Sequence, residues 1–260
     1  MRAVHIYHSG FYMEFAHCTM LFDYYEGTLP PLKTDKPLYV FASHVHQDHF
    51  SFCVFTKEEL RAHPNVIYLL SNDIKRKYNR NFFLRQGVTK EQYERIIFVK
   101  AGETVCTEGE EKNLEGTDEP AAADGLYKSV IRTLCSTDAG VAFLVETDGR
   151  RIFHAGDLNW WSFEGESRED EIEMERAYKD EIKKLSGERI DLACLPLDGR
   201  QKERFALGFD WFMRHVETAH AYPMHYWDDD SVIAGLLALP CSEPYRDRIV
   251  REPELVLQES

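Results

Sequence analysis

The stretch SHVHQDHF at residues 43–50 places three histidines and an aspartate within six consecutive positions, directly after the apolar run PLYVFA. His44 and His46 are two residues apart, so they project to the same side of an extended backbone, and Asp48 and His49 follow where a loop can turn inward. Neutral imidazoles and carboxylates suit Zn²⁺, with Mn²⁺ or Fe²⁺ as alternatives. Without a metal, this clustering would cost desolvation and set protonated imidazoles against each other. The stretch therefore predicts a divalent metal site.

Strand-like and helix-like patterns alternate around this stretch. The first half of the chain is rich in strands, and the Asp-Gly step at 148–149 is a strong signal for a hairpin. In the second half, the buried strand IDLACLPL at 190–197 leads into an amphipathic helix predicted over 207–219. Helices that alternate with strands require a sheet between layers. We therefore expect one layered α/β domain over residues 1–260.

Composition limits the class of partner. The 45 acidic and 31 basic residues give a net charge of −14, which argues against binding to nucleic acid or to an anionic membrane. Neither a secretory signal pattern nor an apolar run of about 18 residues is present, and the six scattered cysteines include no CxxC pair. We expect a cytoplasmic protein with reduced thiols and a small-molecule substrate; the oligomeric state stays open. The acidic segment 107–124 is interpreted as a solvated surface loop.

The HxHxDH pattern after an apolar strand resembles the signature of the metallo-β-lactamase superfamily of metal-dependent hydrolases. IFHAGD at 152–157 and AYPMHYW at 221–227 follow in the order which that superfamily uses. The early HSGFYMEF and LFD segments are similar to the opening strands of the lactonase-like branch, typified by L-ascorbate-6-phosphate lactonase. The resemblance implies a four-layer αββα sandwich, in which two mixed β-sheets lie face to face, helices lie outside, and the metal site lies at one edge.

The resemblance also implies a set of metal ligands. Asp157 would bridge two ions, because it follows a strand as the Gly-Asp of the superfamily does. The remaining implied ligands are His44 and His46 for the first metal, and Asp48, His49 and His225 for the second.

This chain departs from the superfamily at one position. Relatives supply a further histidine to the first metal from a loop before the Gly-Asp, where this chain has TLCSTDAGVAF at 133–143. Asp138 is the strong metal ligand in that neighbourhood and is the candidate replacement. Three outcomes stay open: a dinuclear site with substituted ligation, a lone ion at the second site, or a first site that fills only at high metal concentration.

Several residues are candidates for substrate contact. His8 lies in an early loop that can reach the site, to contact substrate or an outer carboxylate, although a structural role is the alternative. The tryptophans and tyrosine beside Asp157 and His225 either wall a pocket or plug their loops against the core. A guanidinium at the end of the strand 190–197 could bind a substrate carboxylate or phosphate. These further candidates are Trp160, Trp161, Tyr226 with its neighbour Trp227, and Arg200.

The chemistry implied is hydrolysis by metal-bound hydroxide, with Asp48 orienting the water or returning a proton to the leaving group. The sequence contains no GxSxG elbow, phosphate-binding loop or GxGxxG fingerprint that would indicate another mechanism. By similarity to the lactonase-like branch, we expect the substrate to be a lactone or a phosphorylated or ester metabolite. The alternative is a catalytically degraded relative that binds a ligand or partner through the old site.

Overall fold

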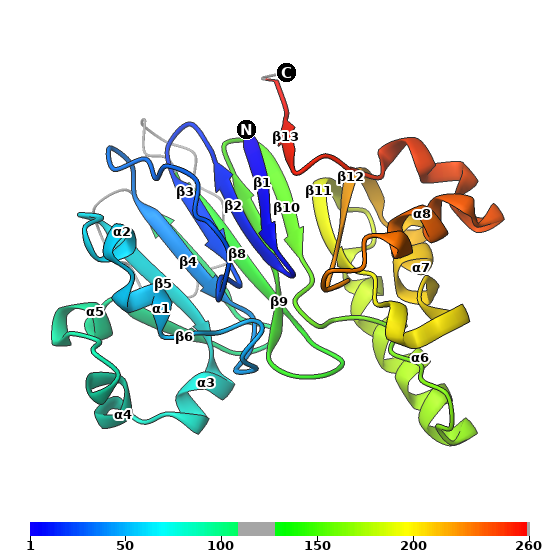
Figure 1. Cartoon of the computed structure of the whole chain (residues 1–260), viewed down its shortest axis with the longest axis horizontal. Helices are drawn as coiled ribbons and strands as arrows, with labels where there is room; N and C mark the ends of the chain where they lie inside the picture. Colours follow the sequence, from blue (N-terminus) through cyan, green and yellow to red (C-terminus); the bar gives the residue numbers. More distant parts are fainter. Residues whose placement is uncertain (109–127, 259–260) are drawn as a thin grey trace.

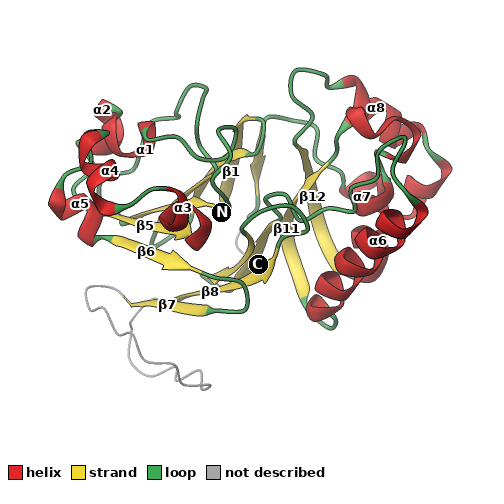
Figure 2. Cartoon of the chain, turned by 90° about the horizontal axis from the view of Figure 1, so that it is seen from below, coloured by secondary structure: helices red, strands yellow, loops and turns green. Residues whose placement is uncertain are grey.

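The computed structural model describes residues 1–108 and 128–258, and these form two β-sheets with helices on their outer faces (Figure 1). Helices α1 to α5 cover one sheet and α6 to α8 the other, so the order of layers is αββα (Figure 2). The predicted four-layer sandwich is confirmed. The helices are α1 (Cys53–Thr56), α2 (Glu58–Arg61), α3 (Asn72–Lys77), α4 (Arg80–Arg85), α5 (Lys90–Glu94), α6 (Arg168–Ile182), α7 (Leu207–His215) and α8 (Ser231–Ala238).

Both sheets are mixed, as predicted. The first has the order β13-β1-β2-β3-β4-β5-β6, with β3 to β6 parallel, and the second has the order β12-β11-β10-β9-β8-β7, with β10 to β12 parallel. The strands of the first sheet are β1 (Arg2–Tyr7), β2 (Gly10–Glu14), β3 (Thr19–Phe22), β4 (Leu38–Ala42), β5 (Val66–Ser71), β6 (Ile96–Val99) and β13 (Glu254–Val256). Those of the second are β7 (Thr104–Glu108), β8 (Lys128–Cys135), β9 (Val141–Thr147), β10 (Arg150–His154), β11 (Arg189–Pro196) and β12 (Glu217–Met224).

Aromatic side chains join the inner faces of the two sheets. Phe22 of β3 stacks on Phe41 of β4 at 4.4 Å between ring centroids, and Phe41 meets Phe143 of β9 edge-on at 5.1 Å. All three rings are buried, and truncating one such ring to alanine typically costs about 3–5 kcal/mol. This packing fixes β4 against β9, and β9 pairs with β10, which matters because the loops after β4 and β10 carry candidate ligands.

Two local predictions have different outcomes. The hairpin is confirmed: β9 and β10 pair antiparallel, and Asp148 and Gly149 both have the positive φ of a type I′ turn, at 51° and 70°. The helix predicted over 207–219 ends earlier, at His215, because residues from Glu217 onward pair in parallel with β11 as strand β12.

Two sequence expectations bear on the rest of the chain. Most of the acidic segment 107–124 lies outside the described residues. Among the residues that are described, no helix combines the length and the apolar character that crossing a membrane requires.

Candidate metal centre

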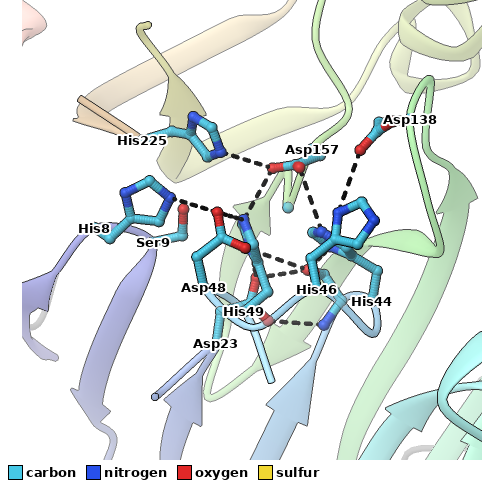
Figure 3. Close-up of polar contacts among 12 residues, drawn as sticks. His8, Ser9, Asp23, His44, His46, Asp48, His49, Asp138, Asp157 and His225 are labelled. Carbon is cyan, nitrogen blue, oxygen red and sulfur yellow. Dashed lines mark hydrogen bonds and ion pairs between the residues drawn. The ribbon is translucent and has the colours of Figure 1, made fainter. Parts of the chain in front are cut away.

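Side chains from loops of both sheets meet at one edge of the sandwich (Figure 3). The 43–50 stretch forms the loop after β4, Asp157 and His225 follow β10 and β12, and Asp138 and His8 lie in the turns between β8 and β9 and between β1 and β2. They form two groups, in each of which the potential ligand atoms lie within 4.8 Å of one another. The first cluster is His44, His46, Asp138 and Asp157, and the second cluster is His8, Asp48, His49 and His225.

The buried carboxylate of Asp157 lies between the two clusters. Its Oδ2 is 3.3 Å from His44 Nε2, while its Oδ1 is 3.1 Å from His49 Nε2 and 3.4 Å from His225 Nε2. Two atoms that bind one tetrahedral ion at 2.0–2.1 Å lie about 3.3 Å apart. Each oxygen of Asp157 therefore faces one cluster at the separation expected of two ligands of a shared ion.

Asp138 lies in the first cluster, in the position where relatives are expected to supply a histidine. Its Oδ2 is 3.5 Å from His46 Nδ1, and both side chains are about half exposed, at 47% and 49%. The turn before β9 can lie against the 43–50 loop because Gly140 has no side chain: a Cβ there would be 2.0 Å from the carbonyl oxygen of Ser43. The sequence located this residue, and the backbone contact explains how it reaches the site.

His8 is itself a member of the second cluster. The sequence analysis had predicted only a contact with substrate or an outer carboxylate, or a structural role. The buried ring of His8 places Nε2 3.5 Å from Asp48 Oδ2, and neither ring nitrogen has a hydrogen-bond partner. His8 has a φ of 54°, a conformation that is costly outside glycine and is often held at functional sites. The histidine between two paired strands was visible in the sequence, but this turn conformation was not.

Asp23, which follows β3, orients His49. It accepts hydrogen bonds from the backbone N–H of Ser43 at 2.7 Å and the Ser43 hydroxyl at 2.6 Å, and it pairs with His49 Nδ1 at 2.8 Å. This contact leaves Nε2 of His49 directed at Asp157, as in the carboxylate–histidine pairs of metal sites. The sequence analysis did not identify Asp23 as a site residue, although its place at the end of a strand parallel to β4 was the available signal.

Comparisons with known proteins agree with this architecture. No protein-family model and no curated protein matches the sequence. A metallo hydrolase from the archaeon Ignicoccus hospitalis matches with a TM-score of 0.57 and 15% identity over 99% of both chains. Isothiocyanate hydrolase from Delia radicum gut bacteria matches with a TM-score of 0.53 and 11% identity, also over 99% of both chains. The chain shares its fold with these two structures, and this αββα sandwich is the architecture that the resemblance to the metallo-β-lactamase superfamily implied.

Asp198 orients His225, a histidine of the second cluster. Its Oδ2 is 3.0 Å from His225 Nδ1, and both of its oxygens accept hydrogen bonds from Arg200 Nε at 2.9 Å. Burial opposes ionisation of Asp198, but the contacts with His225 and Arg200 outweigh it and lower its pKa. Arg200 therefore uses the fork of its guanidinium to hold Asp198. The sequence analysis offered Arg200 as a candidate for binding a substrate carboxylate or phosphate and did not identify this contact.

The tryptophans after Asp157 separate into different environments. Trp161 is buried, donates from Nε1 to the carbonyl of Asp157 at 3.0 Å and meets the ring of His225 edge-on at 5.4 Å. Trp160 packs against Trp211 of α7 at 6.3 Å. Its contacts therefore place Trp160 under a helix of the outer layer, and Trp161 supports the loop that carries Asp157.

The two aromatic residues after His225 also lie in different environments. The hydroxyl of Tyr226 lies 3.2 Å from His5 Nδ1, so the tyrosine, which was predicted to contact substrate, reaches towards β1. Trp227 is 39% exposed, has a φ of 55°, and lies 4.4 Å from the ring of His8. Trp227 is thus the exposed aromatic residue beside the second cluster, which the sequence analysis did not single out from its neighbour.

The charges and unpartnered atoms of the two clusters fit a cation. His44 Nε2, His49 Nε2 and Asp157 Oδ1 are buried and have no hydrogen-bond partner, although each of the two imidazole nitrogens lies within 3.3 Å of an oxygen of Asp157. Such atoms cost free energy unless a partner satisfies them. Burial, reinforced by the neighbouring His49, lowers the pKa of His44 to about 3, which keeps its imidazole neutral. Burial opposes ionisation of Asp157, yet the surrounding histidines outweigh it and hold its pKa well below the usual range.

Proposed function

We propose that this protein is a metal-dependent hydrolase whose two clusters hold one or two divalent ions, Zn²⁺ in the first place and Mn²⁺ or Fe²⁺ as alternatives. The observation that supports this most is the convergence of buried, unpartnered atoms of His8, His44, His49 and Asp157 on one edge of the sandwich. Imidazoles with carboxylates are the donor set that these ions prefer. The two solved structures of the same fold that we compared are named as hydrolases.

A bound divalent ion lowers the pKa of its water from about 15.7 to around 7, and so supplies a nucleophile at neutral pH. Asp157 would contribute one oxygen to each cluster, whereas Asp23 and Asp198 orient His49 and His225 through the ring nitrogens that face away from the ion. These two contacts fix the imidazoles of His49 and His225 before the substrate binds.

Asp48 is the candidate catalytic residue of the chain itself. It is partly exposed, and although burial opposes its ionisation, its contact with His8 and the charge of His49 lower its pKa. Asp48 is therefore ionised at neutral pH, and its carboxylate would orient the attacking water or return a proton to the leaving group.

For the substrate we propose a small cytoplasmic metabolite, either a lactone or a phosphorylated or ester compound, by similarity to the lactonase-like branch. The net charge of −14 supports a small molecule over a nucleic acid or an anionic membrane. One structure of the same fold is named as an isothiocyanate hydrolase, and this supports a small uncharged electrophile as the substrate.

The test is metal content per chain, followed by hydrolysis of lactone, phosphodiester and thioester panels with and without chelator. The hydrolase would be supported by turnover that chelator abolishes and that His44→Ala removes. The matched variant His220→Ala should keep this turnover, because His220 lies on β12 outside both clusters. Stoichiometric metal without turnover on any panel, together with tight binding of a metabolite, would favour the alternative of a degraded enzyme that retains a binding site.

A further inference from the structure

A cavity of about 750 Å³ opens beside the second cluster. Five of the nine residues around it are aromatic, among them Tyr25, Phe52, Tyr78 and Trp227. The volume lies within the range of pockets that bind small ligands, and walls that are mainly aromatic with a few polar groups are typical of such pockets. We refer to it as the aromatic cavity.

The aromatic cavity is continuous with the candidate metal centre. Asp48 lines the cavity and is also a member of the second cluster. Tyr25 and Trp227 contact the ring of His8 from the cavity side, at 6.2 and 4.4 Å between ring centroids. A molecule in this cavity would therefore present one end to the second cluster and keep the rest of its surface against aromatic rings.

Trp227, which lines the aromatic cavity, has a backbone conformation that costs free energy. Its φ of 55° is unfavourable for a bulky side chain, and its ring remains 39% exposed. The guanidinium of Arg200, itself fixed by Asp198, lies 5.6 Å from the centre of the ring. Strain of this kind persists where the surroundings over-determine a conformation, and it is found at ligand sites. An exposed indole fixed beside His8 is suited to stack on a flat ligand.

The charge of the cavity lining restricts the ligand further. Among the residues that the structure describes, Asp48 is the one charged residue of the lining, and the amides of Gln47 and Gln86 supply neutral polar contacts. A carboxylate or phosphate placed among these groups would lose its hydration without gaining a free cation, because the guanidinium beside Trp227, that of Arg200, already holds Asp198. The cavity therefore favours an uncharged group.

We infer that the aromatic cavity binds an uncharged aromatic group of the substrate, next to the bond that is hydrolysed at the second cluster. This inference rests on the proposed hydrolase function and names the chemical class of the group beside the scissile bond. With a lactone or ester as substrate, the hydroxyl of water joins the acyl carbon, the bond to the leaving oxygen breaks, and that oxygen receives the proton.

The test compares substrates that differ in one feature. Dihydrocoumarin and δ-valerolactone share a six-membered lactone, but only the first carries an aromatic ring. Esters of 4-methylumbelliferone with acetate and with phosphate share the aryl group, but differ in charge. Because intrinsic reactivity also differs within each pair, the decisive quantity is the change that a variant produces in the ratio of kcat/KM values.

Trp227→Ala is expected to lower kcat/KM for dihydrocoumarin by about tenfold, mainly through KM, and to lower that for δ-valerolactone much less. Trp227→Phe should recover part of the loss, and the matched control Trp211→Ala, which removes a tryptophan of α7 outside the cavity, should retain the wild-type ratio. Equal losses for both lactones, or an unchanged kcat/KM for both 4-methylumbelliferone esters in Trp227→Ala, would overturn the inference.

Failure of the hydrolase proposal can be recognised separately. If no substrate is hydrolysed, binding of 2-naphthol to the chelator-treated chain, measured by equilibrium dialysis, still tests the cavity. Saturable binding that Trp227→Ala abolishes and Trp211→Ala keeps would support an aromatic subsite without the hydrolase. Absence of saturable binding, or equal binding by both variants, would overturn it.

Discussion

Replacing Asp138 by alanine should lower the metal affinity of the first cluster and leave that of the second cluster nearly unchanged. The first cluster would keep His44, His46 and Asp157, and lose the carboxylate that lies 3.5 Å from His46. Changes to groups that merely orient metal ligands cost 10–100-fold in affinity, and losing a ligand should cost at least as much, so we expect a loss of about 1.4–2.8 kcal/mol or more at this cluster. The second cluster contains no atom of Asp138, so its affinity should change little.

The metal-free chain should respond in the opposite direction. Burial, together with repulsion from Asp157, raises the pKa of Asp138, which means that its negative charge destabilises the fold when no cation is present. Asp138→Ala should therefore leave the Tm of the chelated protein unchanged or higher, while it reduces the rise in Tm that added zinc produces. A purely structural role for Asp138 would lower the Tm of the chelated protein instead.

Equilibrium dialysis against rising free Zn²⁺, with elemental analysis of the protein, measures both affinities. We expect two steps for the wild type and a shift of the weaker step by tenfold or more for Asp138→Ala. The matched control is Asp35→Ala, which removes an exposed aspartate outside both clusters. Coincident titrations of the wild type and Asp138→Ala would refute the assignment of Asp138 to a metal site.

Three further predictions concern the second cluster. His8→Asn, which tolerates the positive φ but removes the imidazole, should weaken its zinc affinity by about tenfold or more in the same dialysis, and an unchanged affinity would exclude His8 as a ligand. Asp23→Asn should weaken it by about 10–100-fold, because His49 loses the carboxylate that orients it, and the Ser43 contacts make a neutral amide the appropriate replacement. In the chelated chain, burial opposes protonation of His49, but Asp157 and Asp23 outweigh it and raise its pKa well above 6.5. Unfolded His49 loses its proton near pH 6.5 while the folded residue keeps it, so the free energy of unfolding should fall above that pH by at most about 1.4 kcal/mol per unit; denaturant titrations that show it rising would contradict this.

The sequence predicted the parts of the site that depend on strand order. An apolar run before the 43–50 stretch indicated a buried strand, and Asp157 and His225 each follow another strand, so their meeting at one edge required only that the two sheets pack face to face. The alternation of strands and helices predicted a layered α/β domain, and the resemblance to the metallo-β-lactamase superfamily implied the four-layer sandwich. Assignment of all these residues as metal ligands stays a prediction until an ion is measured.

The parts that the sequence did not predict depend on turn conformation and tertiary contact. His8 and Trp227 owe their positions to backbone with positive φ, which is uncommon for residues other than glycine and is not visible in the sequence pattern. Asp23 is separated from His49 by 26 residues, and only the parallel pairing of β3 with β4 brings them together. The end of α7 was placed too late because the helical pattern continues past His215, and pairing with β11 outweighs it.

The contrast between the clusters bears on how the site would load and where substrate would react. In the second cluster, His49 and His225 are each fixed by a buried carboxylate. In the first, His46 is half exposed and its neighbour in the cluster, Asp138, is equally open to solvent. Ordering exposed side chains around an ion costs conformational entropy that pre-oriented side chains have already lost. We therefore expect the second cluster to fill first, and since the aromatic cavity opens on that cluster, the better-ordered ion would be the one that faces the substrate.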